Sequence, residues 1–203
     1  MLKIAKSNLE KLYSLINENS LLYLPVKKAG EVNYHVWGEG KEVSLETLKT
    51  VRSPKSAFFP QTENMMKFKR DGNNLEVIDV REKFDERKPL VVFGVKACDY
   101  KAMEVLDKVF LADPVDTFYQ DRRERATVVT LACSRPEESC FCTAFGIDPT
   151  KPMGDVTTWI DGEYLRCRSW YICRARFQDG CQQRLLSCLQ YRKRSSAAVP
   201  ASC

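Results

Sequence analysis

Residues 89–99 read Pro-Leu-Val-Val-Phe-Gly-Val-Lys-Ala-Cys-Asp, and residues 127–133 read Thr-Val-Val-Thr-Leu-Ala-Cys. Each stretch contains a largely apolar run of the kind that is buried in a parallel sheet. Between them, Asp99 is a suitable N-cap for an amphipathic helix that continues to Phe110. A strand, a helix and a second strand in this order form a βαβ unit with parallel strands and a right-handed crossover. We therefore predict an α/β fold with a small mixed sheet, a central βαβ unit and flanking helices.

Weaker patterns predict the elements around this unit. The helical spacing of Leu9, Leu12 and Ile16 favours a helix over residues 3–18. The dipeptide Asp161-Gly162 is typical of a hairpin turn. The remaining predicted elements are strands at 21–26, 34–37 and 75–80, helices at 44–50 and 117–125, and a hairpin at 155–165.

Charge divides the chain into two parts. The chain has 203 residues, 44% of them hydrophobic, and a net charge of +5. Residues 166–203 hold seven arginines, one lysine and one acidic residue, whereas residues 1–165 hold 24 basic and 26 acidic residues. A nucleic-acid-binding domain carries its basic surface on the folded body. We therefore expect no nucleic-acid partner.

We predict an α/β domain over residues 1–165, followed by an irregular basic tail rich in cysteine and arginine over residues 166–203. The tail cysteines match neither a ferredoxin run nor the paired spacing of a zinc site. Their presence indicates metal ligands or disulfides, whereas the absence of any periodicity favours a reading frame that shifted after Leu165. On the second interpretation, the tail is not a native domain. The five tail cysteines are Cys167, Cys173, Cys181, Cys188 and Cys203.

Neither a signal peptide nor a membrane span is expected. The first residues lack the apolar run of a secretory signal, and no apolar stretch reaches the roughly 20 residues that span a bilayer. We expect a cytoplasmic protein, whose cysteines remain reduced.

Four cysteines of the body are candidate metal ligands: Cys98, Cys133, Cys140 and Cys142. Cys98 and Cys133 follow the two predicted parallel strands, so both lie at the sheet edge where sites gather in α/β folds. Cys140 and Cys142 flank Phe141 in a predicted turn. Four thiolates suit a [4Fe–4S] cluster and also satisfy tetrahedral zinc, and free cysteines can simply be buried as small apolar groups. Spacing alone leaves these alternatives open.

Several short motifs resemble one family, the 4Fe-4S dicluster proteins, which include the beta subunit of cytoplasmic sulfhydrogenases and the corresponding iron–sulfur subunit of anaerobic sulfite reductase. They are Phe59-Pro60-Gln61-Thr62-Glu63, Val92 through Asp99, Arg122-Arg123-Glu124, and Leu131 through Thr143. The resemblance covers about residues 52–165. Family members usually add a C-terminal ferredoxin-like domain with two clusters, and the basic tail stands in its place here.

The resemblance implies an iron–sulfur electron-transfer subunit of a hydrogenase-like or sulfite-reductase-like complex, not catalytic alone and truncated before its ferredoxin-like domain. It implies [4Fe–4S] ligation by the four body cysteines and partner subunits that include a flavin- or ferredoxin-type electron donor or acceptor. The alternatives are a structural zinc module that mediates assembly and a non-functional truncated product.

Two other features have both a functional and a structural interpretation. Arg122, Arg123 and Glu124 could dock a partner or neutralise a cluster, but such a trio is more often a solvated helix face. The sole histidine, His35, lies in a strand-like run and is more often structural than a ligand.

Overall fold

The computed structural model describes residues 2–79, 81 and 87–169. Its main feature is a seven-stranded mixed sheet in the order β1-β9-β8-β7-β6-β2-β3. The central strands β2, β6, β7 and β8 are mutually parallel, while β1, β9 and β3 add antiparallel edges. The strands are β1 (Leu2–Ala5), β2 (Leu21–Lys28), β3 (Glu31–Val36), β6 (Leu90–Val95), β7 (Ala126–Leu131), β8 (Val156–Asp161) and β9 (Tyr164–Ser169).

The two central strands β6 and β7 are buried along their whole length. Their side chains alternate between two apolar clusters, so Val91 and Phe93 face one layer and Val92 faces the other. Gly94, at a φ of 86°, interrupts the β6–β7 register between Phe93 and Val95. A Cβ atom at Gly94 would lie 3.2 Å from Leu45, so glycine permits both the positive φ and the close approach.

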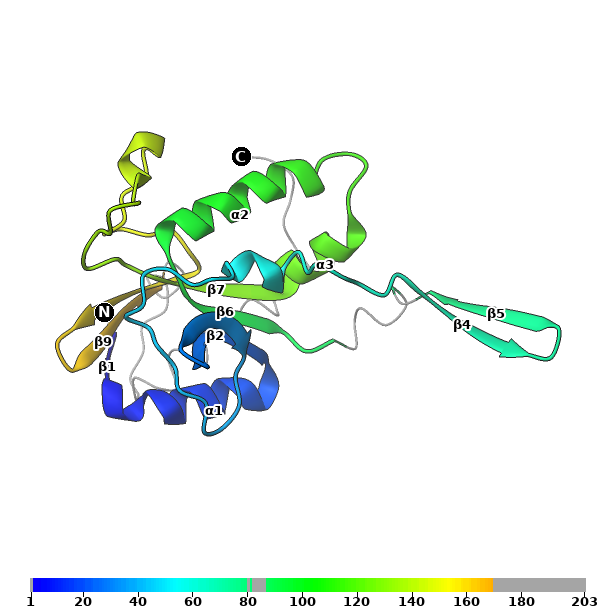
Figure 1. The fold of residues 1–203 in the computed structure, drawn as a ribbon, viewed down its shortest axis with the longest axis horizontal. Helices are drawn as coiled ribbons and strands as arrows, with labels where there is room; N and C mark the ends of the chain where they lie inside the picture. The colour runs from blue at the N-terminus through cyan, green and yellow to red at the C-terminus, as the bar shows by residue number, and fades with distance from the viewer. Residues whose placement is uncertain (1, 80, 82–86, 170–203) are drawn as a thin grey trace, which may run out of the picture.

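Helices cover both faces of the sheet (Figure 1). Helix α1 (Leu9–Asn19) lies on one face and contributes Leu12, Tyr13 and Ile16 to the first apolar cluster. Helices α2 (Ala97–Phe110) and α3 (Thr117–Arg125) lie on the other face and contribute Met103 and Tyr119 to the second cluster. The predicted α/β class is confirmed, and so is the parallel βαβ unit formed by β6, α2 and β7.

Two local predictions in the first fifty residues were wrong. The predicted helix over residues 3–18 is divided into strand β1, a 3-10 turn (Lys6–Asn8) and α1. Leu2 and Ile4 alternate inward as β1 pairs with β9, an interaction that local helical spacing does not reveal. Residues 44–50 form bends and irregular backbone instead of a helix, because this segment begins beside β2, where the Ser44 N–H donates to the Pro25 carbonyl, and contributes Leu45 to the core.

The predicted hairpin around Asp161-Gly162 joins β8 to β9. Strand β9 continues through Ser169, so regular structure extends past Leu165 into the basic segment. Within β9, Cys167 is buried between β1 and β8, where it pairs with Leu2 and Thr158. Residues 170–203, which contain the other four tail cysteines, lie outside the described residues.

A two-stranded hairpin projects away from the rest of the molecule along its long axis (Figure 1). It consists of β4 (Met66–Asp71) and β5 (Asn74–Asp79), paired antiparallel around a turn at Gly72. The sequence predicts a half-buried strand at residues 75–80, but Leu75 and Val77 are 63% and 56% exposed. The structure therefore contains an exposed arm, which we call the β4–β5 arm, where the sequence indicates part of the body.

Candidate cysteine site

The four candidate cysteines follow the C-terminal ends of the two central parallel strands. Cys98 lies in the first turn of α2, directly after β6. Cys133 comes two residues after the end of β7, and its backbone N–H donates to the Pro149 carbonyl at 2.9 Å. Figure 1 shows the segment after β7 rising beside the N-terminal end of α2. Cys98 and Cys133 thus lie beyond the C-terminal ends of β6 and β7, the edge at which the sequence predicts them.

The loop that holds the other two cysteines is organised by its own backbone. The Cys140 N–H donates to the Glu137 carbonyl at 2.9 Å, and the Glu137 N–H donates to the Cys140 Sγ at 3.3 Å. Cys142 begins a short 3-10 helix (Cys142–Phe145), and its carbonyl accepts from Ile147 at 3.0 Å. These local hydrogen bonds position Cys140 and Cys142, and an ion pair between Glu137 and Lys49 ties the loop to a distant segment.

The four thiols influence one another electrostatically. Partial desolvation raises the pKa of Cys98 to about 11, and electrostatic interactions with Asp99 and Cys142 act in the same direction. Cys133 also contributes to this shift. Desolvation raises the pKa of Cys133 as well, and Cys142 and Cys140 act in the same direction. Each of the four cysteines is thus within electrostatic range of at least one other.

All four thiols are free, with Cys98 and Cys140 exposed and Cys133 and Cys142 half-buried. Over the part of the chain that the structure describes, no three His, Cys, Asp or Glu side chains are grouped tightly enough to hold a single metal ion. The donor set is four thiols that follow the C-terminal ends of β6 and β7, and its chemistry suits an iron–sulfur cluster as well as zinc.

A buried lysine that the sequence pattern did not indicate adjoins the cysteines. Lys96 is 6% exposed, and its Nζ donates to the Leu45 carbonyl at 3.3 Å. Burial lowers the pKa of Lys96, while the nearby Cys133, Cys98 and Asp99 oppose that shift. Lys96 directly follows the buried strand β6, a position where a lysine is usually exposed, so the sequence alone does not reveal its burial.

Asp99 is held in place beside this lysine. The Ser53 hydroxyl donates to the Asp99 carboxylate at 2.7 Å, which links α2 to the turn at Pro54–Ala57. Burial raises the pKa of Asp99, and the Ser53 hydrogen bond opposes that shift. The sequence suggests Asp99 as the helix N-cap, but the cap position is Lys96 and Asp99 belongs to the first helical turn.

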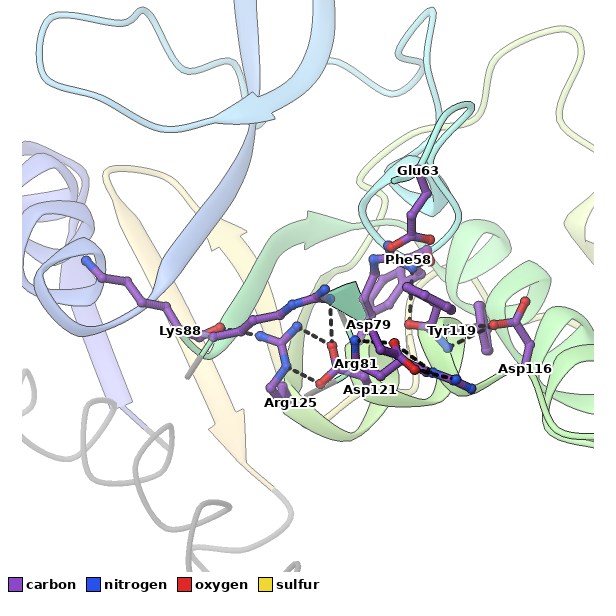
Figure 2. A network of polar contacts seen from close by, with 12 residues as sticks. Phe58, Glu63, Asp79, Arg81, Lys88, Asp116, Tyr119, Asp121 and Arg125 are labelled. Carbon is purple, nitrogen blue, oxygen red and sulfur yellow. Dashed lines mark hydrogen bonds and ion pairs between the residues drawn. The ribbon is translucent and has the colours of Figure 1, made fainter. Parts of the chain in front are cut away.

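The arginines of α3 form hydrogen bonds and ion pairs within the molecule, and Figure 2 shows one of them, Arg125, which donates to Asp121 and to the Lys88 carbonyl. Arg123 donates to both carboxylate oxygens of Asp107 on α2, at 2.7 and 2.6 Å. Arg122 pairs with Glu63 and donates to the Phe58 carbonyl at 3.3 Å. Both guanidinium groups are mostly buried, so the expected solvated helix face is wrong for these two residues. They join α2, α3 and the segment that leads to the β4–β5 arm.

His35 lies on β3, where its backbone pairs with Leu24, and its side chain is exposed. A separate cavity of about 380 Å³ lies between α1 and the segment around Leu45. Tyr13 lines this cavity, and its hydroxyl is the one buried side-chain polar atom without a hydrogen-bond partner among the described residues. The residues that line the cavity include none of the four candidate cysteines.

None of the described helices combines the length and apolar content that crossing a membrane requires. Comparison with known proteins gives no match to a family model and no match to a solved structure.

A curated relative does match the chain. The sulfhydrogenase 2 subunit beta of Pyrococcus furiosus is 32% identical over 136 residues, which make up 67% of this chain and 38% of the relative. The chain therefore spans well under half the length of that protein. The resemblance predicted from the motifs is confirmed: over the matched residues, the chain is a member of the sulfhydrogenase beta-subunit family.

Proposed function

We propose that this chain is an iron–sulfur electron-transfer subunit of a hydrogenase-like redox complex. In this proposal Cys98, Cys133, Cys140 and Cys142 together hold one [4Fe–4S] cluster. The single observation that carries the assignment is the position of all four cysteines after the C-terminal ends of β6 and β7, each within electrostatic range of at least one other. The relationship to a sulfhydrogenase beta subunit supports the redox class.

The architecture suits a thiolate-bound cofactor. Strands β6 and β7 are buried on both faces, so they form a rigid base for the first turn of α2, which carries Cys98, and for the loop that carries Cys133. Such a cluster accepts and releases one electron at a time. The chain's own residues would fix its position and adjust its surroundings. Among the described residues we identify no group that would act on a substrate at this edge.

Lys96 supplies a positive charge on the buried side of the proposed site. A cluster with four thiolate ligands is an anionic group, and an ammonium in a region of low dielectric stabilises nearby negative charge strongly. The Leu45 carbonyl holds the ammonium where it faces Cys133 and Cys98. In our proposal Lys96 stabilises the more negative, reduced state and therefore raises the reduction potential.

Electrons would enter and leave through neighbouring subunits. The relative is named as a subunit, so it works within a larger assembly, and its name favours a hydrogenase over a sulfite reductase. We propose that the partners include a flavin- or ferredoxin-type electron donor or acceptor. The ferredoxin-like domain that is usual in the family would belong to the portion of the relative that this chain does not span.

Anaerobic reconstitution with iron and sulfide tests the proposal. We expect about four iron and four sulfide per chain, a broad visible absorbance and a paramagnetic reduced state. Cys140→Ser should remove most of the iron, because it deletes one of the four ligands. The matched control is Cys167→Ala, a cysteine buried in β9 away from the proposed ligands.

Several outcomes would contradict the assignment. A colourless protein that takes up one zinc per chain would indicate a structural zinc module instead. Equal loss of iron from Cys140→Ser and from Cys181→Ser, a residue outside the described range, would move the site into the basic tail. A body that neither expresses in folded form nor melts cooperatively would indicate a non-functional product.

A further inference from the structure

One face of the β4–β5 arm is apolar and exposed. The cross-strand pairs Phe68–Val77, Met66–Asp79 and Arg70–Leu75 place these six side chains on the same face. The opposite face carries the pairs Lys67–Ile78, Lys69–Glu76 and Asp71–Asn74. The four apolar residues of the first face are between 56% and 63% exposed: Met66, Phe68, Leu75 and Val77. The arm is therefore amphipathic, although neither face lies on the body.

The arm lacks the support that a hairpin needs. Among the described elements, the only extensive packing of β4 is with β5, and Figure 1 shows both strands clear of the sheet and helices. A two-stranded hairpin alone is at best marginally stable in water. An exposed apolar face of this kind marks a surface that another molecule covers.

We propose that the covering molecule is a second copy of this chain, whose arm packs face to face against the first in an antiparallel orientation. A hairpin with one apolar and one charged face is what a two-layer sandwich of two arms requires, since the charged faces stay in water. A pair related by a two-fold axis is also the commonest form of soluble oligomer. Because the arms project outward, the two bodies lie at opposite ends of this sandwich.

Charge on the apolar face supports the antiparallel orientation. Arg70 lies near the tip of the arm and Asp79 near its base. Antiparallel packing brings Arg70 of each copy to the end where the other copy's Asp79 lies. A parallel arrangement would instead place the two Arg70 side chains at one end. Because Asp79 already accepts from Arg81 of its own chain, the separation of the two like-charged Arg70 side chains is what favours the antiparallel orientation.

The apolar area of the arm limits the expected affinity of the dimer. The apolar face offers roughly 500 Å² per copy, so a face-to-face pair buries on the order of 1,000 Å² in total, near the lower limit for a specific interface. We therefore expect a dimer that dissociates in the micromolar range. This inference does not depend on the proposed cluster.

Sedimentation velocity of the full chain in reducing buffer, over a range of concentrations, tests the inference. We expect the wild type to pass from monomer to dimer as concentration rises. Phe68→Ser should weaken dimerisation by about tenfold or more, because it removes the central apolar contact. The matched control is Lys69→Ser, the next residue along β4 on the opposite face, which should dimerise like the wild type.

A second measurement separates an interface effect from unfolding of the arm. In the wild type, hydrogen exchange at residues 66–79 should slow as concentration rises, while exchange in β6 stays constant. A wild type that stays monomeric at every concentration would overturn the inference. Undiminished dimerisation of Phe68→Ser, or an arm whose exchange does not depend on concentration, would overturn it equally.

Discussion

The central pair β6–β7 and the β4–β5 arm are both two adjacent strands of six residues each, but their surroundings differ completely. Every residue of β6 and β7 is buried, whereas every residue of β4 is exposed. The first pair positions the candidate ligands Cys98 and Cys133, and the arm presents Phe68 and Val77 to solvent. Strand pairing alone therefore does not determine what a pair of strands does. Burial on both faces lets β6–β7 support the candidate site. Exposure leaves one face of the arm available for the contact that we propose.

The same substitution in the two regions should give the largest difference. Phe93 on β6 is fully buried and contacts the Tyr13 ring edge to face, with ring centroids 5.7 Å apart. We expect Phe93→Ala to lower the free energy of unfolding by about 3–5 kcal/mol, because it leaves a cavity in the core. Phe68→Ala on the arm should change the stability of the monomer by less than about 0.5 kcal/mol. Thermal or denaturant unfolding of dilute protein measures the change in stability of each variant. Equal losses would contradict the difference in burial between the two regions.

Two aspartates, Asp107 in the body and Asp79 in the arm, allow the same comparison for charged groups. Burial pushes the pKa of Asp107 upward, but hydrogen bonds from Arg123 and Tyr119 outweigh it and hold the pKa below its ordinary value. Stability from this group is therefore present above the unfolded-state pKa and is lost as the pH falls through the folded-state pKa. We expect Asp107→Asn to cost about 2 kcal/mol at neutral pH and to reduce the loss of stability in acid.

The control for that prediction is Asp79, at the base of the arm. Hydrogen bonds from Arg81 lower its pKa too, but this pair is exposed to solvent. Asp79→Asn should therefore leave unfolding of the body unchanged at neutral and acid pH. Chemical unfolding monitored between neutral pH and about pH 3 would compare the two variants. An effect of Asp79→Asn as large as that of Asp107→Asn would show that the interactions of Asp107 with Arg123 and Tyr119 are not a special source of stability.

The smallest expected effect concerns the link between the two regions. Arg122 on α3 pairs with Glu63, just before the arm, and is largely buried. We expect Arg122→Ala to cost about 1 kcal/mol and to speed hydrogen exchange near Glu63, while exchange in β6 is unchanged. Hydrogen exchange followed by mass spectrometry checks both expectations. Unchanged exchange near Glu63 would show that the ion pair does not restrain this segment.

The sequence was most informative where local pattern and tertiary burial agree. The apolar runs at 89–95 and 127–132 predict parallel strands, and the structure confirms β6, α2 and β7 close to the expected limits. The local pattern gave a wrong prediction where pairing with a distant strand determines the secondary structure. Leu2 and Ile4 form strand β1 because β9 lies beside them, although Leu9, Leu12 and Ile16 alone favour an early helix.

Exposure of the arm could not be predicted for a related reason. The sequence of residues 75–80 alternates like a half-buried strand, and nothing in that pattern says whether the covering surface belongs to the same chain. For the site, spacing identified four cysteines but not their neighbour Lys96, since a lysine after a strand is usually exposed. Lys96 Nζ donates to the carbonyl of Leu45, a contact between residues 51 positions apart that no local pattern reveals.

X-ray absorption at the iron edge of the anaerobically reconstituted chain tests whether the four cysteines hold one cluster. If four cysteines bind one [4Fe–4S] cluster, only sulfur atoms lie at bonding distance from iron, and the spectrum also shows iron–iron scattering. Replacing Cys98 or Cys133 by serine should abolish both signals. A spectrum without iron–iron scattering, or one that is unchanged in both variants, would contradict the account.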